Sequence, residues 1–217
     1  MKPLAPPGVY APQEDTDLLI GALRDEPLPH GASVLDVGTG SGALAIEAAR
    51  RGTHVTAVDL SWRAVCTARV NARLAGLPVR TRRGNLFAPV RGQSFDLIMA
   101  NPPYVPAPDT GRPPHGAARS WDAGCDGRLI LDRICGEAPD LLRPGGVLLV
   151  VHSTLSCPDR TLAHLRGAGL KASVTRRRTI PYGPVLRSRE HWLRTRGLLP
   201  APEQTEELVV VRAEVTV

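Results

Sequence analysis

Apolar and polar positions along this chain follow two different periods in turn, and this alternation predicts strands and helices in regular succession. The predicted strands are SVLDV (33–37), HVTAVD (54–59), PVRTRRGN (78–85), FDLIMA (95–100) and VLLVVH (147–152). Apolar residues at helical spacing lie between them, for example in WRAVCTARVNARLAG (62–76), which a glycine ends. The succession predicts an α/β fold with a doubly wound, parallel sheet and right-handed crossovers.

Two segments lie outside this repeating core. QEDTDLLIGALRD (13–25) has leucines at helical spacing, and the acidic residues at its start suit the positive end of a helix. Residues 102–127 are rich in Pro, Gly and polar side chains, and so long a loop inside a compact domain usually has a function. Further helices and strands fill the C-terminal part. We expect one domain over residues 1–217.

The composition is typical of a globular protein of the cytoplasm. The chain has 217 residues, 42% hydrophobic and 22% charged, which suffices for one core but not comfortably for two. Its start, MKPLAPPGVY, lacks the apolar segment of a signal peptide, and the apolar runs are too short to cross a bilayer. Four cysteines without a C-x-x-C pair favour ordinary thiols. We therefore expect no metal site and no membrane contact.

Positive charge exceeds negative charge, with a net charge of +6 at pH 7 and a pI near 9.7. Such a surface suits a partner that carries phosphates, such as RNA or a ribosomal complex. The arginine-rich, lysine-poor composition of a GC-rich genome would produce the same balance. The run RRR (176–178) also has two interpretations, namely contact with an acidic or RNA surface, or a plain solvated face.

Glycine and acidic residues stand where the predicted strands end, which is where doubly wound sheets bind their ligands. In DVGTGSG (36–42), Gly38 and Gly40 allow the backbone to turn sharply and a ligand to approach closely. Asp59 ends the second strand, where a carboxylate can accept hydrogen bonds from two ribose hydroxyls. Gly38, Gly40 and Ala43 also satisfy the dinucleotide pattern G-x-G-x-x-G/A, so NAD remains an open interpretation.

Two further residues favour S-adenosylmethionine over NAD. Asp36 lies in the first strand just before the glycines, where a carboxylate would repel a pyrophosphate but attract an ammonium group. Asn85 follows the third strand, and its amide suits the hydrogen-bonding edge of an adenine. Together these residues predict S-adenosylmethionine as the cofactor.

The fourth predicted strand ends in NPPY, and this turn carries candidate chemistry. The two prolines have no N–H group, so the turn presents acceptors without competing donors. The side chain of Asn101 and the carbonyl of Pro102 could hold both hydrogens of a planar NH2 group, on which Tyr104 could stack. The nitrogen, a weak nucleophile, would then lie in line with a sulfonium methyl group. The plainer interpretation of NPPY alone is an ordinary turn at a strand end.

The chain resembles the class I S-adenosylmethionine-dependent methyltransferases of the protein-glutamine N(5)-methyltransferase type, whose signature is (D/N)-P-P-Y. Two more specific stretches are EDTDLL (14–19), which matches E-D-T-x-x-L, and WDAGCDG (121–127), which matches W-x-x-G-x-D-G. They make the chain most similar to the subgroup that modifies the Gly-Gly-Gln glutamine of eukaryotic and archaeal release factors. The resemblance implies a Rossmann-like, seven-stranded sheet, mostly parallel with an antiparallel C-terminal strand. It also implies methyl transfer to a protein glutamine in a release-factor-like loop.

The same resemblance implies roles for individual residues. The implied cofactor-binding residues are Thr16 and Gly38 at the methionine end, Asp36 at the amino group, Gly40 in the same loop, Asp59 at the ribose and Asn85, a position that is Asp in many relatives, at the adenine. Asn101 would contact both the cofactor and the target glutamine, and Pro102 and Tyr104 would complete the catalytic pocket. Residues 1–30 would cover the cofactor, and residues 102–127 would lie on the substrate side.

Several features leave the substrate and partners open. Trp121 is either a wall of the substrate pocket or a packing anchor of the loop, and His115 is expected to be an exposed loop residue. Ala123 stands where relatives tend to have glycine, and the C-terminal part is longer than expected. Only about thirty residues precede the first strand, too few for the N-terminal helical domain of the bacterial release-factor enzymes. Eukaryotic relatives use a small zinc-bearing activator subunit, and the sequence leaves open whether this bacterial-looking chain has one.

Other functions remain as alternatives. With the same cofactor, the methyl acceptor could be adenine in RNA or DNA, or a small-molecule amine or amide. The chain lacks a target-recognition domain, which argues against sequence-specific DNA methylation, so a nucleic acid acceptor is not favoured. A non-catalytic protein that retains the cofactor pocket is the remote alternative, and NAD-dependent oxidoreduction ranks last.

Overall fold

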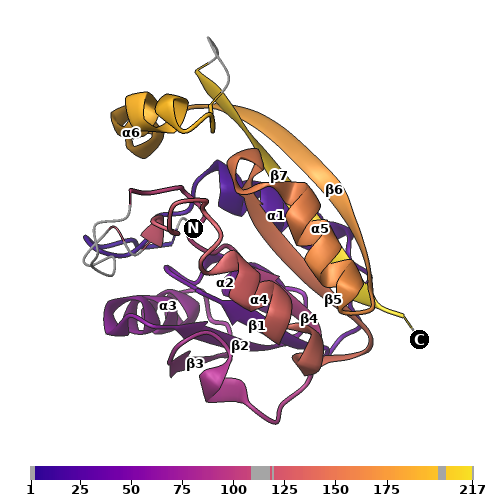
Figure 1. The fold of residues 1–217 in the computed structure, drawn as a ribbon. Helices are drawn as coiled ribbons and strands as arrows, with labels where there is room; N and C mark the ends of the chain where they lie inside the picture. Colours follow the sequence, from indigo (N-terminus) through magenta and orange to yellow (C-terminus); the bar gives the residue numbers. More distant parts are fainter. Residues whose placement is uncertain (1–2, 109–117, 119, 200–203, 217) are drawn as a thin grey trace.

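The computed structural model describes residues 3–108, 118, 120–199 and 204–216, and in this part seven strands form one sheet in the order β3-β2-β1-β4-β5-β7-β6 (Figure 1). The strands are β1 (Ser33–Val37), β2 (His54–Asp59), β3 (Val79–Arg83), β4 (Phe95–Ala100), β5 (Leu142–Ser153), β6 (Leu170–Pro181) and β7 (Thr205–Val215). β1 to β5 pair in parallel, and β7 is antiparallel to both of its neighbours. The predicted seven-stranded, mostly parallel sheet with an antiparallel C-terminal strand is confirmed.

Helices cover both faces of the sheet, because successive residues of a strand point to opposite sides. In β4, Leu97 and Met99 pack in the same core cluster as residues of α1 and α2, whereas Ile98 and Ala100 pack in the cluster that contains residues of α4 and α5. The α-helices are α1 (Glu14–Asp25), α2 (Ala43–Ala49), α3 (Trp62–Leu74), α4 (Leu131–Glu137), α5 (Pro158–Gly167) and α6 (Pro184–Thr195). The central strands are thus buried on both faces, as their continuous apolar runs predict.

β5 begins earlier than the sequence pattern indicates. The sequence predicts a turn at Pro144–Gly145–Gly146, but the strand already starts at Leu142. Leu142 pairs with Phe95 and Val147 pairs with Leu97, so the register between β4 and β5 shifts at the Pro-Gly-Gly stretch. The stretch interrupts the ladder without ending the strand, because its neighbours on both sides still pair with β4.

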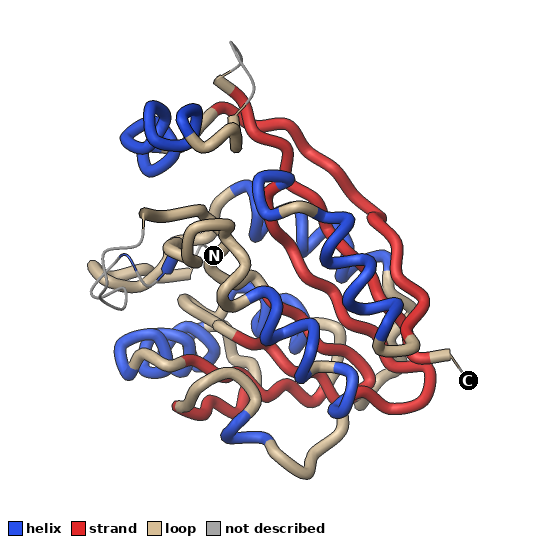
Figure 2. Tube along the Cα trace, viewed as in Figure 1, coloured by secondary structure: helices blue, strands red, loops and turns tan. Residues whose placement is uncertain are grey.

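α6 lies between β6 and β7 in sequence and stands apart from the sheet, where these two long strands lead to it (Figure 2). A small apolar cluster of its own holds it, built from Tyr182, Leu186, Leu193 and Leu199. Val105, from the loop that follows β4, packs against this cluster. The cluster that holds α6 therefore packs against the loop that follows β4.

The arginine run at 176–178 is paired with carboxylates of the same chain. The pairs are Arg176 with Asp25 (2.5 Å), Arg177 with Glu207 (2.6 Å) and Arg178 with Glu14 (2.6 Å). Two of these carboxylates belong to α1 and one to β7. The run therefore ties β6 to its neighbours and is not the free basic patch that the sequence left open.

The cysteines are free thiols, of which Cys135 alone is buried. Within the described ranges no group of three or more His, Cys, Asp or Glu side chains is placed to hold a metal ion. In the same ranges no helix has the length and apolar character needed to cross a bilayer.

Candidate active site

Asp36 is a fully buried carboxylate at the carboxyl end of β1, and it lacks a partner on one side. Its Oδ2 accepts hydrogen bonds from the Thr39 hydroxyl (2.6 Å) and from the backbone N–H of Ala45 in α2 (3.1 Å). Its Oδ1 is buried and has no hydrogen-bond partner. Burial raises the pKa of Asp36 to about 7, with a smaller contribution from the charge of Asp59. A cation or a hydrogen-bond donor placed at Oδ1 would therefore offset the cost of burying this carboxylate.

The glycine loop after β1 is closed by Asp59, the last residue of β2. The Asp59 carboxylate accepts hydrogen bonds from the backbone N–H groups of Gly40 (3.0 Å) and Ser61 (2.8 Å). Gly42, which ends the loop, has a φ of +85°, and a Cβ placed on it would lie 3.0 Å from Ala68 in α3. The loop thus turns tightly between β1 and α2, and the partly exposed carboxylate of Asp59 lies beside it.

The N-terminal segment is fastened to the NPPY turn through Asp15, a buried residue in the first turn of α1. Its Oδ2 accepts hydrogen bonds from the hydroxyls of Tyr10 (2.7 Å) and Tyr104 (3.2 Å), and its Oδ1 accepts from the backbone N–H of Thr16 (2.6 Å). Burial first, and the charge of Asp15 second, raise the pKa of both tyrosines, so both act as neutral donors. A Cβ added to Gly40 would lie 3.7 Å from Tyr10, which places this tyrosine beside the glycine loop.

Asn101 lies where β4 ends, between the N-terminal helix and the glycine loop. Its Nδ2 donates a hydrogen bond to the Thr16 hydroxyl (3.3 Å). Its backbone carbonyl lies 3.9 Å from the position that a Cβ on Gly38 would occupy. The fold therefore brings together Thr16, Gly38 and Asn101, three of the residues that the sequence places at the site.

The WDAGCDG stretch (121–127) packs against the backbone of the NPPY turn. A Cβ on Gly127 would lie only 2.3 Å from the carbonyl oxygen of Tyr104, and the φ of Gly127 is +72°. The same carbonyl accepts a hydrogen bond from the Ser156 hydroxyl (2.7 Å). The next residue, Arg128, is almost fully buried and binds the backbone carbonyls of Ser156 and Cys157. The stretch therefore positions Tyr104 by close backbone packing, which only glycine permits.

A short bridge joins the two ends of the loop between β4 and α4. The backbone N–H of Val105 donates to the carbonyl of Trp121 (2.8 Å), and that of Ala123 donates to the carbonyl of Val105 (3.0 Å). Arg189 of α6 completes the arrangement, since it donates to the carbonyl of Pro106 (3.1 Å) and forms a largely buried ion pair with Asp122 (2.6 Å). Trp121 is half-buried, and the hydrogen bonds described for it involve its backbone, so the role of its side chain stays a prediction.

A third buried carboxylate at the site, after Asp36 and Asp15, belongs to Glu206. Glu206, near the start of β7, is hydrogen-bonded to Ser153 at the end of β5, and its Oε2 is buried without a partner. Burial, and to a smaller extent the charge of Asp15, raise the pKa of Glu206 to about 7. Glu206 in turn contributes to the raised pKa of Tyr104. It therefore belongs electrostatically to the Asp15 cluster.

One predicted site residue, Asn85, and one predicted loop residue, His115, need separate mention. Asn85 is exposed, and its Oδ1 accepts a hydrogen bond from Arg133 of α4 (3.2 Å), which leaves its Nδ2 and one lone pair of Oδ1 to serve a ligand. His115 lies outside the described residues.

The family follows from comparison with known sequences. The sequence model described as "Methyltransferase small domain" matches residues 3–112, which is just over half of the chain. The chain belongs to the methyltransferase small domain family. The match covers the glycine loop, Asp59 and the NPPY turn of this methyltransferase, the segments whose geometry is described above.

Individual relatives of the methyltransferase carry more specific names. A Methanocaldococcus jannaschii protein named for protein N5-glutamine methyltransferase activity is 34% identical, covering 81% of this chain and 88% of its own. Proteins named release factor glutamine methyltransferase, from Geobacter sulfurreducens and Deinococcus radiodurans, are each 39% identical over 66% and 85% of this chain. This chain spans 53% and 66% of those two bacterial proteins. The resemblance to protein-glutamine N(5)-methyltransferases is thereby confirmed.

Solved structures share the fold of the methyltransferase. A chain of the E. cuniculi Mtq2–Trm112 complex, which is responsible for the methylation of the termination factor eRF1, matches with a TM-score of 0.68 and 25% identity over 96% of this chain and 99% of that chain. The T. thermophilus rRNA methyltransferase RsmC, solved with AdoMet and guanosine, matches with a TM-score of 0.61 and 21% identity over 94% of this chain and 43% of its own. The second likeness concerns the fold alone.

Sequence reasoning missed several residues of the methyltransferase site. Asp15 lies within EDTDLL (14–19), where its position one residue before Thr16 was the available signal, and Tyr10 lies four residues before this stretch. Glu206 offered no signal, because EELVVVRAEV is typical of an ordinary strand. Arg189 was equally hidden in a helix of mixed polarity.

Proposed function

We propose that this methyltransferase moves a methyl group from S-adenosylmethionine to the side-chain amide nitrogen of a protein glutamine. The observation that carries the proposal is the hydrogen bond between Asn101 and Thr16. It joins the NPPY turn, which presents acceptors for an NH2 group, to the N-terminal helix beside the glycine loop. A nitrogen held by Asn101 would thus face a cofactor that lies over Gly38.

The residues present fit S-adenosylmethionine. The buried, unpartnered Oδ1 of Asp36 would accept the cofactor's ammonium group, which would remove the cost of a lone buried carboxylate. Asp59 would hold the ribose hydroxyls with its remaining lone pairs, and Gly40 would let the cofactor approach the loop. Asn85 would donate to the adenine through Nδ2. When bound, the cofactor supplies an electrophilic methyl group on a sulfonium ion.

Electrostatics supports a cationic reactant. Asp15, Asp36, Asp59 and Glu206 gather around the site, and among the described residues none of the four forms an ion pair with Lys or Arg. Uncompensated negative charge in a region of low dielectric favours a positive ligand and disfavours a pyrophosphate. This charge distribution therefore favours S-adenosylmethionine over NAD.

The acceptor chemistry would be carried by the NPPY turn. The Asn101 side-chain oxygen and the Pro102 carbonyl would accept the two N–H hydrogens of the glutamine amide, and the Tyr104 ring would stack on its plane. The nitrogen lone pair would form the new N–C bond as the methyl carbon leaves sulfur, and a proton of the methylated nitrogen would pass to solvent. Acceptors on the N–H groups would stabilise the positive charge that grows on nitrogen.

The class of substrate is proposed from the relatives. They are named for protein-glutamine methylation, and one solved relative acts on a termination factor together with a second subunit. We accordingly propose an exposed glutamine loop of a translation protein as the substrate, approaching the NPPY turn beside the point where α6 is fastened to the loop after β4. A small activator subunit would be compatible with this arrangement.

Incubation with radiolabelled S-adenosylmethionine and purified release factors, followed by peptide mapping, tests the proposal. We expect label on one glutamine, and we expect Asn101→Ala to retain S-adenosylhomocysteine binding while transfer falls by about 100-fold or more. Label found only in RNA, DNA or a small molecule would assign the enzyme to one of those acceptors instead.

A further inference from the structure

The excess positive charge of the chain is confined to one segment. Between Leu60 and Phe95 there are seven arginines and no Asp, Glu or Lys. They are Arg63, Arg69, Arg73, Arg80, Arg82, Arg83 and Arg91. The rest of the chain has 20 Lys and Arg residues against 21 Asp and Glu residues, so the net charge of +6 resides in α3, β3 and the turn that follows. A genome-wide bias toward arginine would not separate the charges in this way.

These arginines are also uncompensated in the fold. None of the seven forms an ion pair with Asp or Glu in the described part of the chain, whereas the exposed arginines of β6 are each paired. Where they have partners, these are neutral: Arg69 donates to the Thr81 hydroxyl (3.0 Å) and Arg82 to the carbonyl of Pro89 (3.0 Å). Their full charge therefore faces solvent.

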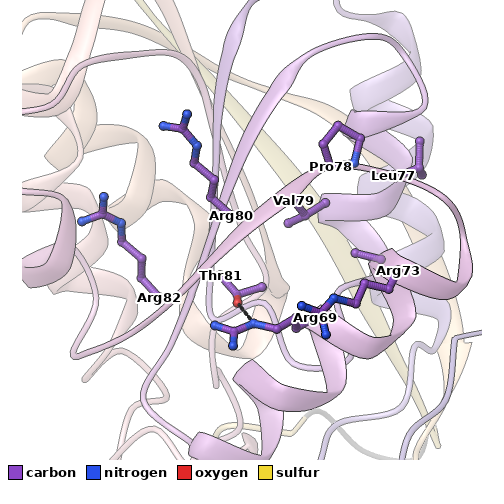
Figure 3. Close-up of a pocket in the computed structure, with 9 residues that line it drawn as sticks. Arg69, Arg73, Leu77, Pro78, Val79, Arg80, Thr81 and Arg82 are labelled. Atoms are coloured by element: carbon purple, nitrogen blue, oxygen red, sulfur yellow. Dashed lines mark hydrogen bonds between the residues drawn. The ribbon is translucent and has the colours of Figure 1, made fainter.

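Four of them line one hollow at the edge of the sheet, with Arg80 and Arg82 pointing away from Arg69 and Arg73 (Figure 3). Arg69 and Arg73 come from α3 and Arg80 and Arg82 from β3, around a cavity of about 500 Å³ that contains no acidic side chain (Figure 3). We call these four residues the arginine face. Residues two apart on a strand lie about 7 Å from one another, and residues four apart on a helix about 6 Å. Both spacings resemble the separation of neighbouring phosphates along an extended nucleic acid strand.

An aromatic side chain stands near this segment as well. Trp62, at the start of α3, is 59% exposed, and the guanidinium of Arg83 lies 5.2 Å from its ring centre. An exposed ring beside free guanidinium groups is the combination that binds single strands, because bases stack on the ring while the guanidinium groups hold phosphates. An added protein strand fits less well, since arginines on both sides of an edge strand oppose further pairing.

We propose that the arginine face binds the backbone of single-stranded RNA. β3 lies at the edge of the sheet, three strands and thus about 14 Å from β4, so bound RNA would leave the NPPY turn accessible. The surface would hold the methyltransferase on a substrate associated with RNA and raise the rate of encounter. The choice of RNA among polyanions rests on the proposed function, because translation proteins work in contact with RNA.

Fluorescence anisotropy with a labelled 15-nucleotide oligouridylate and the full chain, measured at several salt concentrations, tests the proposal. Arg80→Gln/Arg82→Gln should weaken binding about tenfold and lower the slope of log K against log salt by about 1.4. The matched control is Arg50→Gln/Arg177→Gln, which removes two charges that are 49% and 54% exposed elsewhere. It should change the affinity less than twofold.

Three results would overturn the proposal. They are no binding of the oligouridylate by the wild-type protein at 50 mM salt, equal weakening by both double variants, or displacement of RNA by polyglutamate of equal charge at equal concentration. The last result would assign the surface to an acidic protein. Binding needs neither cofactor nor methyl transfer, so a failure here is distinguishable from a failure of the proposed glutamine methylation.

Discussion

The hydroxyl of Tyr104 donates a hydrogen bond to the carboxylate of Asp15 at 3.2 Å, although 89 residues separate the two in sequence. This contact fastens the proposed substrate side of the site to the helix that carries Thr16 on the proposed cofactor side. A change at Tyr104 should therefore affect mainly the substrate side, whereas a change at Asp15 should affect both sides.

Tyr104→Phe should lower kcat/KM for the protein substrate about tenfold, because the ring remains but loses a hydrogen bond to a charged group worth about 1.5 kcal/mol. Affinity for S-adenosylhomocysteine should stay within twofold. Asp15→Asn should impair both quantities, since Asp15 also accepts from Thr16. Initial rates and calorimetry measure the two effects. If the two variants behave alike, Asp15 does not link the two sides.

Asp36→Asn should stabilise the ligand-free protein at high pH. The pKa of Asp36 is about 7 in the folded protein, above the value of about 4 for an unfolded chain, so the free energy of unfolding falls as pH rises from 4 to 7 and stays low above 7. The variant should gain on the order of 3 kcal/mol at pH 8 and nothing at pH 4. Thermal unfolding at both pH values gives the comparison.

The same variant should bind S-adenosylhomocysteine at least about tenfold more weakly, because the ammonium group loses its charged partner. A stabilised protein with undiminished affinity would show that Asp36 does not hold the amino group.

Gly127→Ala should destabilise the protein by about 2–4 kcal/mol, since the added methyl group would meet the Tyr104 carbonyl at 2.3 Å. Gly76 supplies the control, because its φ of +70° is similar but nothing lies within 4 Å of the added Cβ. Gly76→Ala should cost only about 1 kcal/mol. Chemical denaturation measures both, and equal losses would mean that packing against Tyr104 is unimportant.

Arg189→Met should raise KM for the protein substrate several-fold and leave S-adenosylhomocysteine affinity unchanged. The ion pair with Asp122 and the bond to Pro106 connect α6 to the loop after β4, and their loss would release that side of the proposed substrate opening. Arg187→Met, on the same helix but exposed, should change neither quantity. An unchanged KM in the first variant would exclude α6 from substrate binding.

Much of the site could be predicted from the sequence because its parts are local. A carboxylate, three glycines and a helix within DVGTGSGA form a turn whatever the rest of the chain does, and a two-residue period marks where each strand ends. Parallel strands bring their carboxyl ends to one edge, so Asp36, Asp59 and Asn101 were predictable as neighbours. The same reasoning predicted the doubly wound sheet.

Long-range contacts were beyond that reasoning. The pairing of Asp15 with Tyr104, the approach of Glu206 to the same cluster and the anchoring of α6 by Arg189 join segments far apart in sequence. Local periodicity records which face of an element is buried and not which distant group it meets. For the same reason the sequence shows that no acidic residue lies between Leu60 and Phe95, but not whether the arginines there, or those at 176–178, meet carboxylates of other segments.

The sequence by itself therefore determined the order of strands and helices, the turns at their ends and the types of polar group placed there. Only the tertiary structure decided which of those groups are neutralised. Arg176 meets Asp25, whereas Arg80 meets no carboxylate, and Asp36 keeps one oxygen without a partner. The physical reason is that charge pairing and desolvation depend on distances of a few ångströms between chain segments, which only the folded packing sets.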